Sequence, residues 1–241
     1  MYVGIEFPLR HLRTKEASRA AHMNRSGPAH IIETDADLRA GIRALRRKCP
    51  HLRRAHDRAG DPPLRPHAPG FAGLARIVVG QQLSIASAEA IWSRVQAAVK
   101  PMSARAFLEL SDDELRQAGL SRGKVRTLRA MSEAIEAGLD LKQLAAAPEE
   151  VVHETLTALP GIGPWSADIF LLFCHGRADA FAAGDLALQT AAANAMQLAR
   201  RPSREELLAI AERWRPWRGV AAHMLWAYYK VPPDPQDRKK A

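Results

Sequence analysis

Cysteine is nearly absent from this sequence of 241 residues, in which only Cys49 and Cys174 occur. Two isolated cysteines exclude a disulfide framework, a four-cysteine zinc site and an iron–sulfur cluster. The nine histidines form no HExxH motif and no close pair beside a cysteine. The sequence therefore carries no recognisable signature of a zinc enzyme.

Long apolar runs are also missing. The densest run covers residues 169–174 (IFLLFC), whereas a membrane-spanning helix needs roughly 20 apolar residues. The first residues lack the charged start and apolar stretch of a signal peptide. With 47% hydrophobic and 25% charged residues, the composition is that of a globular protein. We expect a cytoplasmic protein, associated with the nucleoid if it is bacterial, that does not contact membranes.

Positive charge is plentiful but unevenly placed. The formal net charge is +9, and residues 1–70 contain 14 Lys or Arg against 7 Asp or Glu. Such an excess suits a polyanion such as nucleic acid, but a solvated basic face is an equally good explanation. Charge alone leaves open whether the basic cluster at 43–58 contacts DNA.

Helix signals dominate the chain, and alternating β-type segments are nearly absent. Thr34 and Ser84 stand at cap positions before apolar residues with helical spacing, and Ser111 with Glu114 forms a capping box. Gly138 marks a helix end. These patterns predict an all-α protein of about ten helices.

Residues 159–167 (LPGIGPWSA) lie between two helical patterns. Glycines on both sides of one apolar residue permit positive φ and close backbone approach. The amides of Gly161 and Gly163, together with those that open the next helix, are candidates for phosphate binding. A tight turn between two helices is the alternative explanation.

The sequence resembles a known family at this point. The hairpin LPGIG (159–163) is similar to that of helix–hairpin–helix DNA glycosylases, and AAGD (182–185) resembles the loop and aspartate that complete their signature. IVVGQQLS (77–84) and RWRPWR (213–218) resemble segments of the DNA-3-methyladenine glycosylase II branch. The chain is thus identified as a member of the HhH-GPD superfamily, with similarity over roughly residues 71–230.

The resemblance implies a bilobal helical fold with the active-site cleft between the lobes. Residues 31–74 and 186–232 would form one lobe, and residues 75–185 the central lobe with the hairpin. We expect a loosely ordered extension at 1–30, a tail at 233–241, and the short form of the family without its N-terminal β-domain.

The implied activity is that of a monofunctional DNA glycosylase in base excision repair. Such an enzyme acts on double-stranded DNA, rotates out an alkylated purine such as 3-methyladenine and hydrolyses its N-glycosidic bond. We expect a monomer that needs no cofactor for catalysis. Two alternatives stay open: a non-catalytic DNA-binding module, and a glycosylase for deaminated or ethenylated purines.

Asp185 is the residue to which the resemblance assigns catalysis, whereas its position before a helix by itself indicates only an N-cap. Trp165 and Trp226 resemble the aromatic walls of the base pocket, and core packing is the alternative for both. Ile169 replaces an aromatic residue of well-studied relatives, which implies a roomier pocket. Bifunctional relatives have lysine at position 165, and residues 143–229 contain none, so no lyase activity is expected.

The DNA contacts are also carried over from the family. Gln82, with Gln81 or Leu83 as alternatives, resembles the plug that fills the gap left by the rotated nucleotide; a buried polar tie between helices is the other explanation. The amides of Gly161 and Gly163 would bind phosphate together with Ser166. The carbonyls that would hold a structural Na⁺ or K⁺ are those of Thr157, Leu159 and Ile162.

Overall fold

The computed structural model describes residues 30–232. The expected extension at 1–30, apart from His30, and the tail at 233–241 lie outside the described residues. Within 30–232 the chain is helical and contains no strand, only an isolated antiparallel bridge between Ile31 and Arg177. The prediction of an all-α fold is confirmed. In this range no helix has the length and apolarity needed to cross a membrane.

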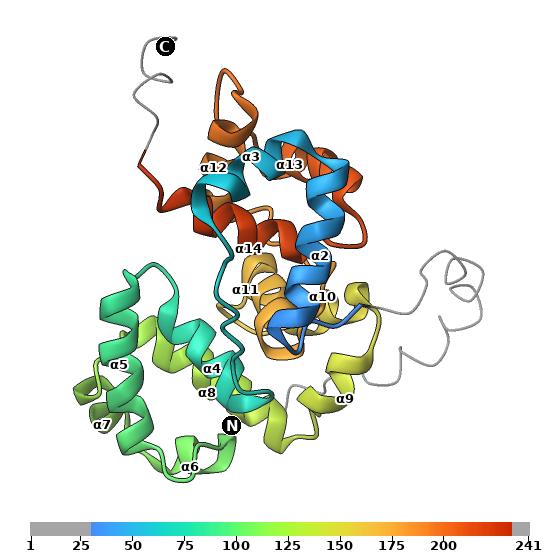
Figure 1. Cartoon of the computed structure of the whole chain (residues 1–241). Coiled ribbons are helices and arrows are strands. Elements are labelled where there is room, and N and C mark those ends of the chain that lie inside the picture. The colour runs from blue at the N-terminus through green and yellow to red at the C-terminus, as the bar shows by residue number, and fades with distance from the viewer. Residues whose placement is uncertain (1–29, 233–241) are drawn as a thin grey trace.

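Helices from the two ends of the described chain pack together in the upper part of Figure 1. Helix α14 lies against α2, α3 and α12, and α13 packs on α12. The bounds are α2 Asp35–Lys48, α3 Pro50–Ala59, α12 Leu186–Met196, α13 Arg204–Ala211, the 3-10 turn η4 Glu212–Trp214 and α14 Arg218–Tyr229.

The middle of the chain forms a second group of helices. Helix α4 packs on α5, α8 and α11, and α8 also covers α6 and α7. The bounds are α4 Phe71–Gly80, α5 Ile85–Ala98, α6 Ala104–Glu109, α7 Asp112–Gln117, α8 Arg122–Glu136, α9 Leu141–Ala146, α10 Glu149–Thr157, α11 Pro164–Ile169 and the π-helical turn η3 Phe170–Cys174. The segment from α3 to α4 passes between the two groups (Figure 1).

The cap positions read from the sequence are confirmed. Thr34 and Ser111 each form a complete capping box, and the Ser84 hydroxyl accepts the Ser87 amide. A third capping box is formed by Ser203 at the start of α13. Residues 30–232 nevertheless contain more helices than the roughly ten expected, in part because α6 and α9 have only six residues each. So short a helix shows no full period of apolar residues in the sequence.

Helix α14 is fastened to the loop that leads to α12. The Gly219 amide donates to the Ala178 carbonyl at 2.7 Å, and a Cβ at Gly219 would lie 2.8 Å from that oxygen. Glycine is therefore required for this close approach.

Arg218 strengthens the same junction. Its side chain is 4% exposed and reaches Asp179 at 3.0 Å, Glu212 at 3.4 Å and Glu149 at 3.8 Å. One buried cation thus joins the start of α14, the loop before α12 and the start of α10.

Replacing Arg218 by methionine removes this cation. Asp179 and Glu212 keep their ion pairs with Arg215, whereas the partly buried Glu149 loses its arginine partner. We expect Arg218→Met to lower the free energy of unfolding by about 1–3 kcal/mol, measured by urea denaturation. Arg200→Met is the matched control, because it breaks an exposed ion pair with Glu206. Equal unfolding free energies in the two variants would contradict a stabilising role for the buried cation.

Candidate active site

Asp185 lies where the two groups of helices meet, as the N-cap of α12. Its Oδ1 accepts the Leu188 amide at 2.9 Å, so the cap indicated by the sequence is present. The side chain is half-buried rather than enclosed among core methyl groups.

Two tryptophans from other helices bind the same carboxylate. The indole Nε1 of Trp165, on α11, donates to Oδ2 at 2.9 Å, and that of Trp226, on α14, donates to Oδ1 at 3.2 Å. An N-cap requires one backbone donor, whereas this carboxylate receives three N–H groups from three helices. Asp185 is therefore fixed in position far more firmly than helix capping demands.

Ile169 lies at the end of α11, one turn after Trp165, and is 5% exposed. Its side chain belongs to the hydrophobic core, and its part in a base pocket stays a prediction. The rings of Phe173 and His223 pack against Trp226, at centroid distances of 5.5 and 6.0 Å. Sequence reasoning missed both residues, although the spacing of His223 and Trp226, three apart on one helix, was a usable signal.

The hairpin between α10 and α11 has the expected tight turn. Gly161 has φ 81°, and a Cβ there would lie 2.0 Å from the Thr127 hydroxyl oxygen. Among residues 30–232 the amides of Gly161 and Gly163 donate to no protein group. They are free to bind an anion, as the sequence predicts.

The carbonyls suggested for a monovalent cation belong to this hairpin. The Leu159 carbonyl accepts the Ile162 amide at 3.1 Å, which leaves one of its two lone pairs available. Thr157 directs its hydroxyl to the His153 carbonyl at 2.7 Å, away from its own carbonyl. The donor chemistry fits Na⁺ or K⁺, and the cation stays a prediction.

The turn between α4 and α5 separates the three plug candidates. Gln82 is exposed, with φ 57°, and Leu83 is 38% exposed. Gln81 instead donates from Nε2 to the Ser166 hydroxyl at 2.9 Å and to the Gly161 carbonyl at 3.2 Å. Ser166 is 2% exposed, so its hydroxyl faces Gln81 and not a surface where phosphate would bind.

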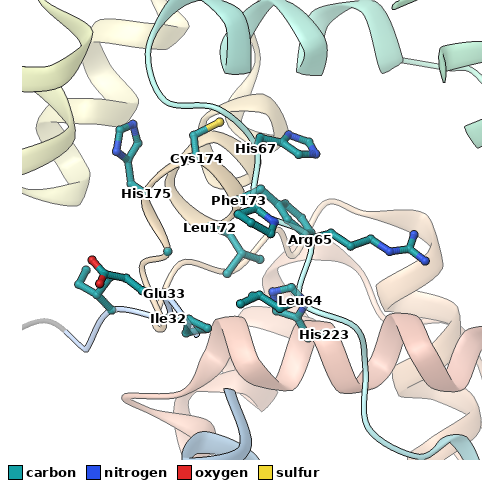
Figure 2. Close-up of a pocket in the computed structure, with 13 residues that line it drawn as sticks. Ile32, Glu33, Leu64, Arg65, His67, Leu172, Phe173, Cys174, His175 and His223 are labelled. Atoms are coloured by element: carbon teal, nitrogen blue, oxygen red, sulfur yellow. The ribbon is translucent and has the colours of Figure 1, made fainter. Parts of the chain in front are cut away.

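A cavity of about 340 Å³ adjoins the aromatic residues around Trp226. Figure 2 shows its lining, in which Phe173 and His223 also contact Trp226. Trp226 itself does not line the cavity, so Phe173 and His223 connect the cavity to the tryptophan that binds Asp185. Burial lowers the pKa of His223 and of His67 to about 4, so both imidazoles are neutral at pH 7.

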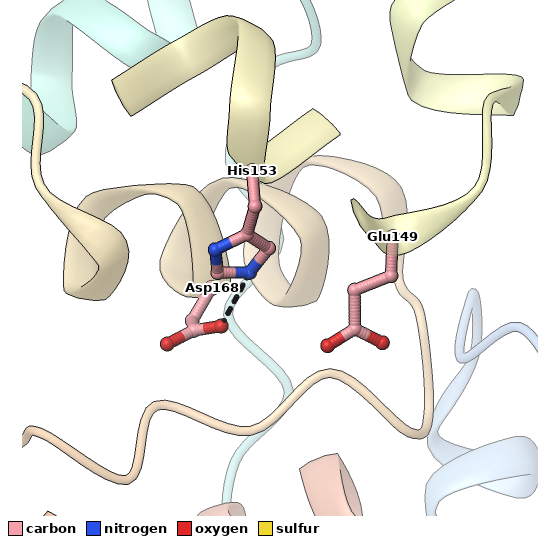
Figure 3. A group of neighbouring side chains, drawn as sticks. All are labelled: Glu149, His153 and Asp168. Atoms are coloured by element: carbon pink, nitrogen blue, oxygen red, sulfur yellow. Dashed lines mark ion pairs between the residues drawn. The ribbon is translucent and has the colours of Figure 1, made fainter. Parts of the chain in front are cut away.

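Glu149, His153 and Asp168 form a separate cluster at α10 and α11 (Figure 3). Their ligand atoms lie within 4.8 Å of one another. His153 Nε2 pairs with Asp168 at 2.9 Å, and this hydrogen bond raises the pKa of His153, whereas burial raises that of Asp168. Glu149 faces Arg218. The charges are partnered within the protein, so the cluster needs no metal ion for compensation.

His223 makes stability depend on pH. The pKa of His223 is about 4 in the folded protein and 6.5 in the unfolded chain. Between pH 4 and 6.5 the unfolded chain therefore binds a proton at this residue more tightly than the folded protein does. The stability due to neutral His223 is complete above pH 6.5 and is lost as the pH falls toward 4. The free energy of unfolding of the wild type falls between pH 7 and pH 5, and we expect His223→Gln to reduce this fall by about 2 kcal/mol, measured by urea denaturation. Parallel pH profiles for wild type and variant would contradict this assignment.

Comparisons with known proteins identify the family and the fold. Residues 75–216, more than half of the chain, match the model of the HhH-GPD superfamily base excision DNA repair proteins. A Mycobacterium tuberculosis protein described as a probable bifunctional transcriptional activator/DNA repair enzyme AlkA is 29% identical over 220 residues. The match covers 84% of this chain but only 42% of that protein.

Solved structures share the fold. The DNA-3-methyladenine glycosidase of Bacillus halodurans is 32% identical, with a TM-score of 0.68 over 79% of this chain and 89% of that one. Schizosaccharomyces pombe Mag1, solved in complex with abasic DNA, has a TM-score of 0.75 at 24% identity, over 81% of this chain and 98% of that one. The chain therefore belongs to the HhH-GPD superfamily of base excision DNA repair proteins.

Proposed function

We propose that this protein is a monomeric, monofunctional DNA glycosylase. It rotates an alkylated purine such as 3-methyladenine out of double-stranded DNA and hydrolyses its N-glycosidic bond. The observation that carries the proposal is the half-buried Asp185 carboxylate, held by Trp165, Trp226 and the Leu188 amide. The name of the Bacillus halodurans relative, a DNA-3-methyladenine glycosidase, supports the substrate class.

Asp185 acts on the sugar. Cleavage of an N-glycosidic bond builds positive charge on the sugar ring, and a nearby carboxylate stabilises that charge or orients the attacking water. The indole N–H groups hold both carboxylate oxygens before substrate arrives. Little reorganisation is then needed when the charge develops.

The leaving base needs little help. An alkylated purine such as 3-methyladenine is already cationic, so it departs without a strong acid, and one carboxylate suffices. The indole faces of Trp165 and Trp226 attract such a base, with about 0.5–2 kcal/mol per cation–π contact. Because the N-glycosidic bond of an alkylated purine is labile, the bond itself does much of the discrimination between damaged and normal bases.

The DNA is held by the hairpin and the α4–α5 turn. Rotating the nucleotide out costs a few kcal/mol, and the exposed Gln82 fills the gap as a polar plug. The free amides of Gly161 and Gly163 bind phosphate. A monovalent cation on the Thr157, Leu159 and Ile162 carbonyls would steady the hairpin without a part in catalysis.

Removing the charge of Asp185 tests the chemistry. We expect Asp185→Asn to reduce base release by about 10³-fold or more, because the sugar cation loses its counter-charge while DNA binding persists. The bases freed from methylated duplex DNA are measured by mass spectrometry. Asp140→Asn is the matched control, since Asp140 is also an N-cap, on α9. If the two variants released bases equally well, Asp185 would serve only as the N-cap of α12.

The same assay separates the alternatives. Salt-sensitive DNA binding without any base release by the wild type would indicate a non-catalytic DNA-binding module. Release of deaminated or ethenylated purines, but not of alkylated ones, across a panel of lesions would change the substrate class and keep the mechanism.

The absence of lysine at position 165 predicts the reaction product. We expect an abasic strand that stays intact until alkali is added, and no covalent adduct on borohydride reduction, because a Schiff base requires an amine nucleophile. Gel analysis of a labelled oligonucleotide measures both. A borohydride-trapped adduct would show that this protein is a lyase as well.

A further inference from the structure

The side chain of Gln81 is half-buried and is hydrogen-bonded within the protein. Its side-chain amide donates to the Ser166 hydroxyl at 2.9 Å and to the Gly161 carbonyl at 3.2 Å. Both acceptors belong to the hairpin segment, about 80 residues further along the chain. A residue held in this way is not available to enter a DNA duplex.

The neighbouring turn needs external support. Gln82 adopts φ 57°, a conformation that residues other than glycine rarely adopt. Two contacts hold the residues that lead into this turn. Lys124 of α8 donates to the Val79 carbonyl at 2.6 Å, near the end of α4, and Gln81 donates to the hairpin residue Gly161 and to Ser166. The exposed Gln82 thus follows directly after a segment that is held by α8 and by the hairpin.

The two residues that accept the Gln81 hydrogen bonds lie next to the active site. Ser166 follows Trp165, whose indole holds Asp185. Gly161 offers its free amide to phosphate, while its carbonyl accepts the Gln81 amide. Gln81 therefore connects the plug turn with both the phosphate contact and the segment that positions the carboxylate.

We propose that Gln81 is a positioning residue for base flipping. By fixing the α4–α5 turn to the hairpin, it places Gln82 in register with Asp185, so that the gap is filled at the nucleotide whose sugar meets the carboxylate. This inference rests on the proposed function, since it requires Gln82 to be the plug. It assigns different roles to the two adjacent glutamines.

The test is a double-mutant cycle on the full chain. The DNA is a duplex with a tetrahydrofuran abasic analogue and 2-aminopurine on the opposite strand, whose fluorescence reports plug insertion without base release. Gln81→Met keeps the side-chain length but cannot donate a hydrogen bond. We expect Gln81→Met and Gln82→Ala each to weaken the fluorescence response about tenfold, and the double variant to lose little more.

Controls separate positioning from loss of folding. Gln81→Leu, which likewise has no hydrogen-bond donor, gives the same defect with an unchanged unfolding midpoint, and Gln143→Met on the exposed face of α9 behaves as the wild type. A wild-type response in Gln81→Met, or additive losses in the double variant, would overturn the role of Gln81. If the wild type gave no fluorescence response, both the positioning role of Gln81 and the role of Gln82 as the plug would be overturned.

The proposed function can fail separately. A wild type that gives the fluorescence response but releases no base would contradict glycosylase activity while the cycle still tests Gln81. Conversely, base release with independent losses at positions 81 and 82 would keep the enzyme and remove the positioning role.

Discussion

The site depends on one set of hydrogen bonds, in which two indoles and a backbone amide bind a single carboxylate. Each donor comes from a different helix, so the position of Asp185 reports how α11, α12 and α14 are packed. A carboxylate with fixed oxygens is suited to a charge that develops at one place on a substrate. The same bonds orient the two indole faces, which links the placement of a base to the placement of the charge.

The surrounding fold secures this arrangement with buried polar contacts. Arg218 joins α14 to the loop before Asp185 and to α10, and the close contact at Gly219 allows no larger residue. Such contacts fix the relative positions of these segments, because separating a buried cation from its carboxylates would raise the free energy of the folded state. The packing of α14 therefore controls where Trp226 meets Asp185.

Two buried histidines beside Phe173 show a different constraint, since His67 stacks on that ring and His223 contacts both Phe173 and Trp226. Burial keeps both imidazoles neutral, so they add no positive charge at pH 7. A cationic base near Trp226 would meet no repulsion from the adjacent His223 ring. This effect arises from packing, since an exposed histidine would titrate near pH 6.5.

The sequence by itself determined the helical class, the caps at Thr34, Ser84 and Ser111, the glycine turn and the family, because each depends on residues close together in the chain or on motifs in order. It named Asp185, Trp165 and Trp226 but not the bonds among them. Only the tertiary structure decided those bonds, the separate places of Gln81 and Gln82, the burial of Ser166 and the neutral histidines. These depend on contacts between distant segments, which local spacing does not encode.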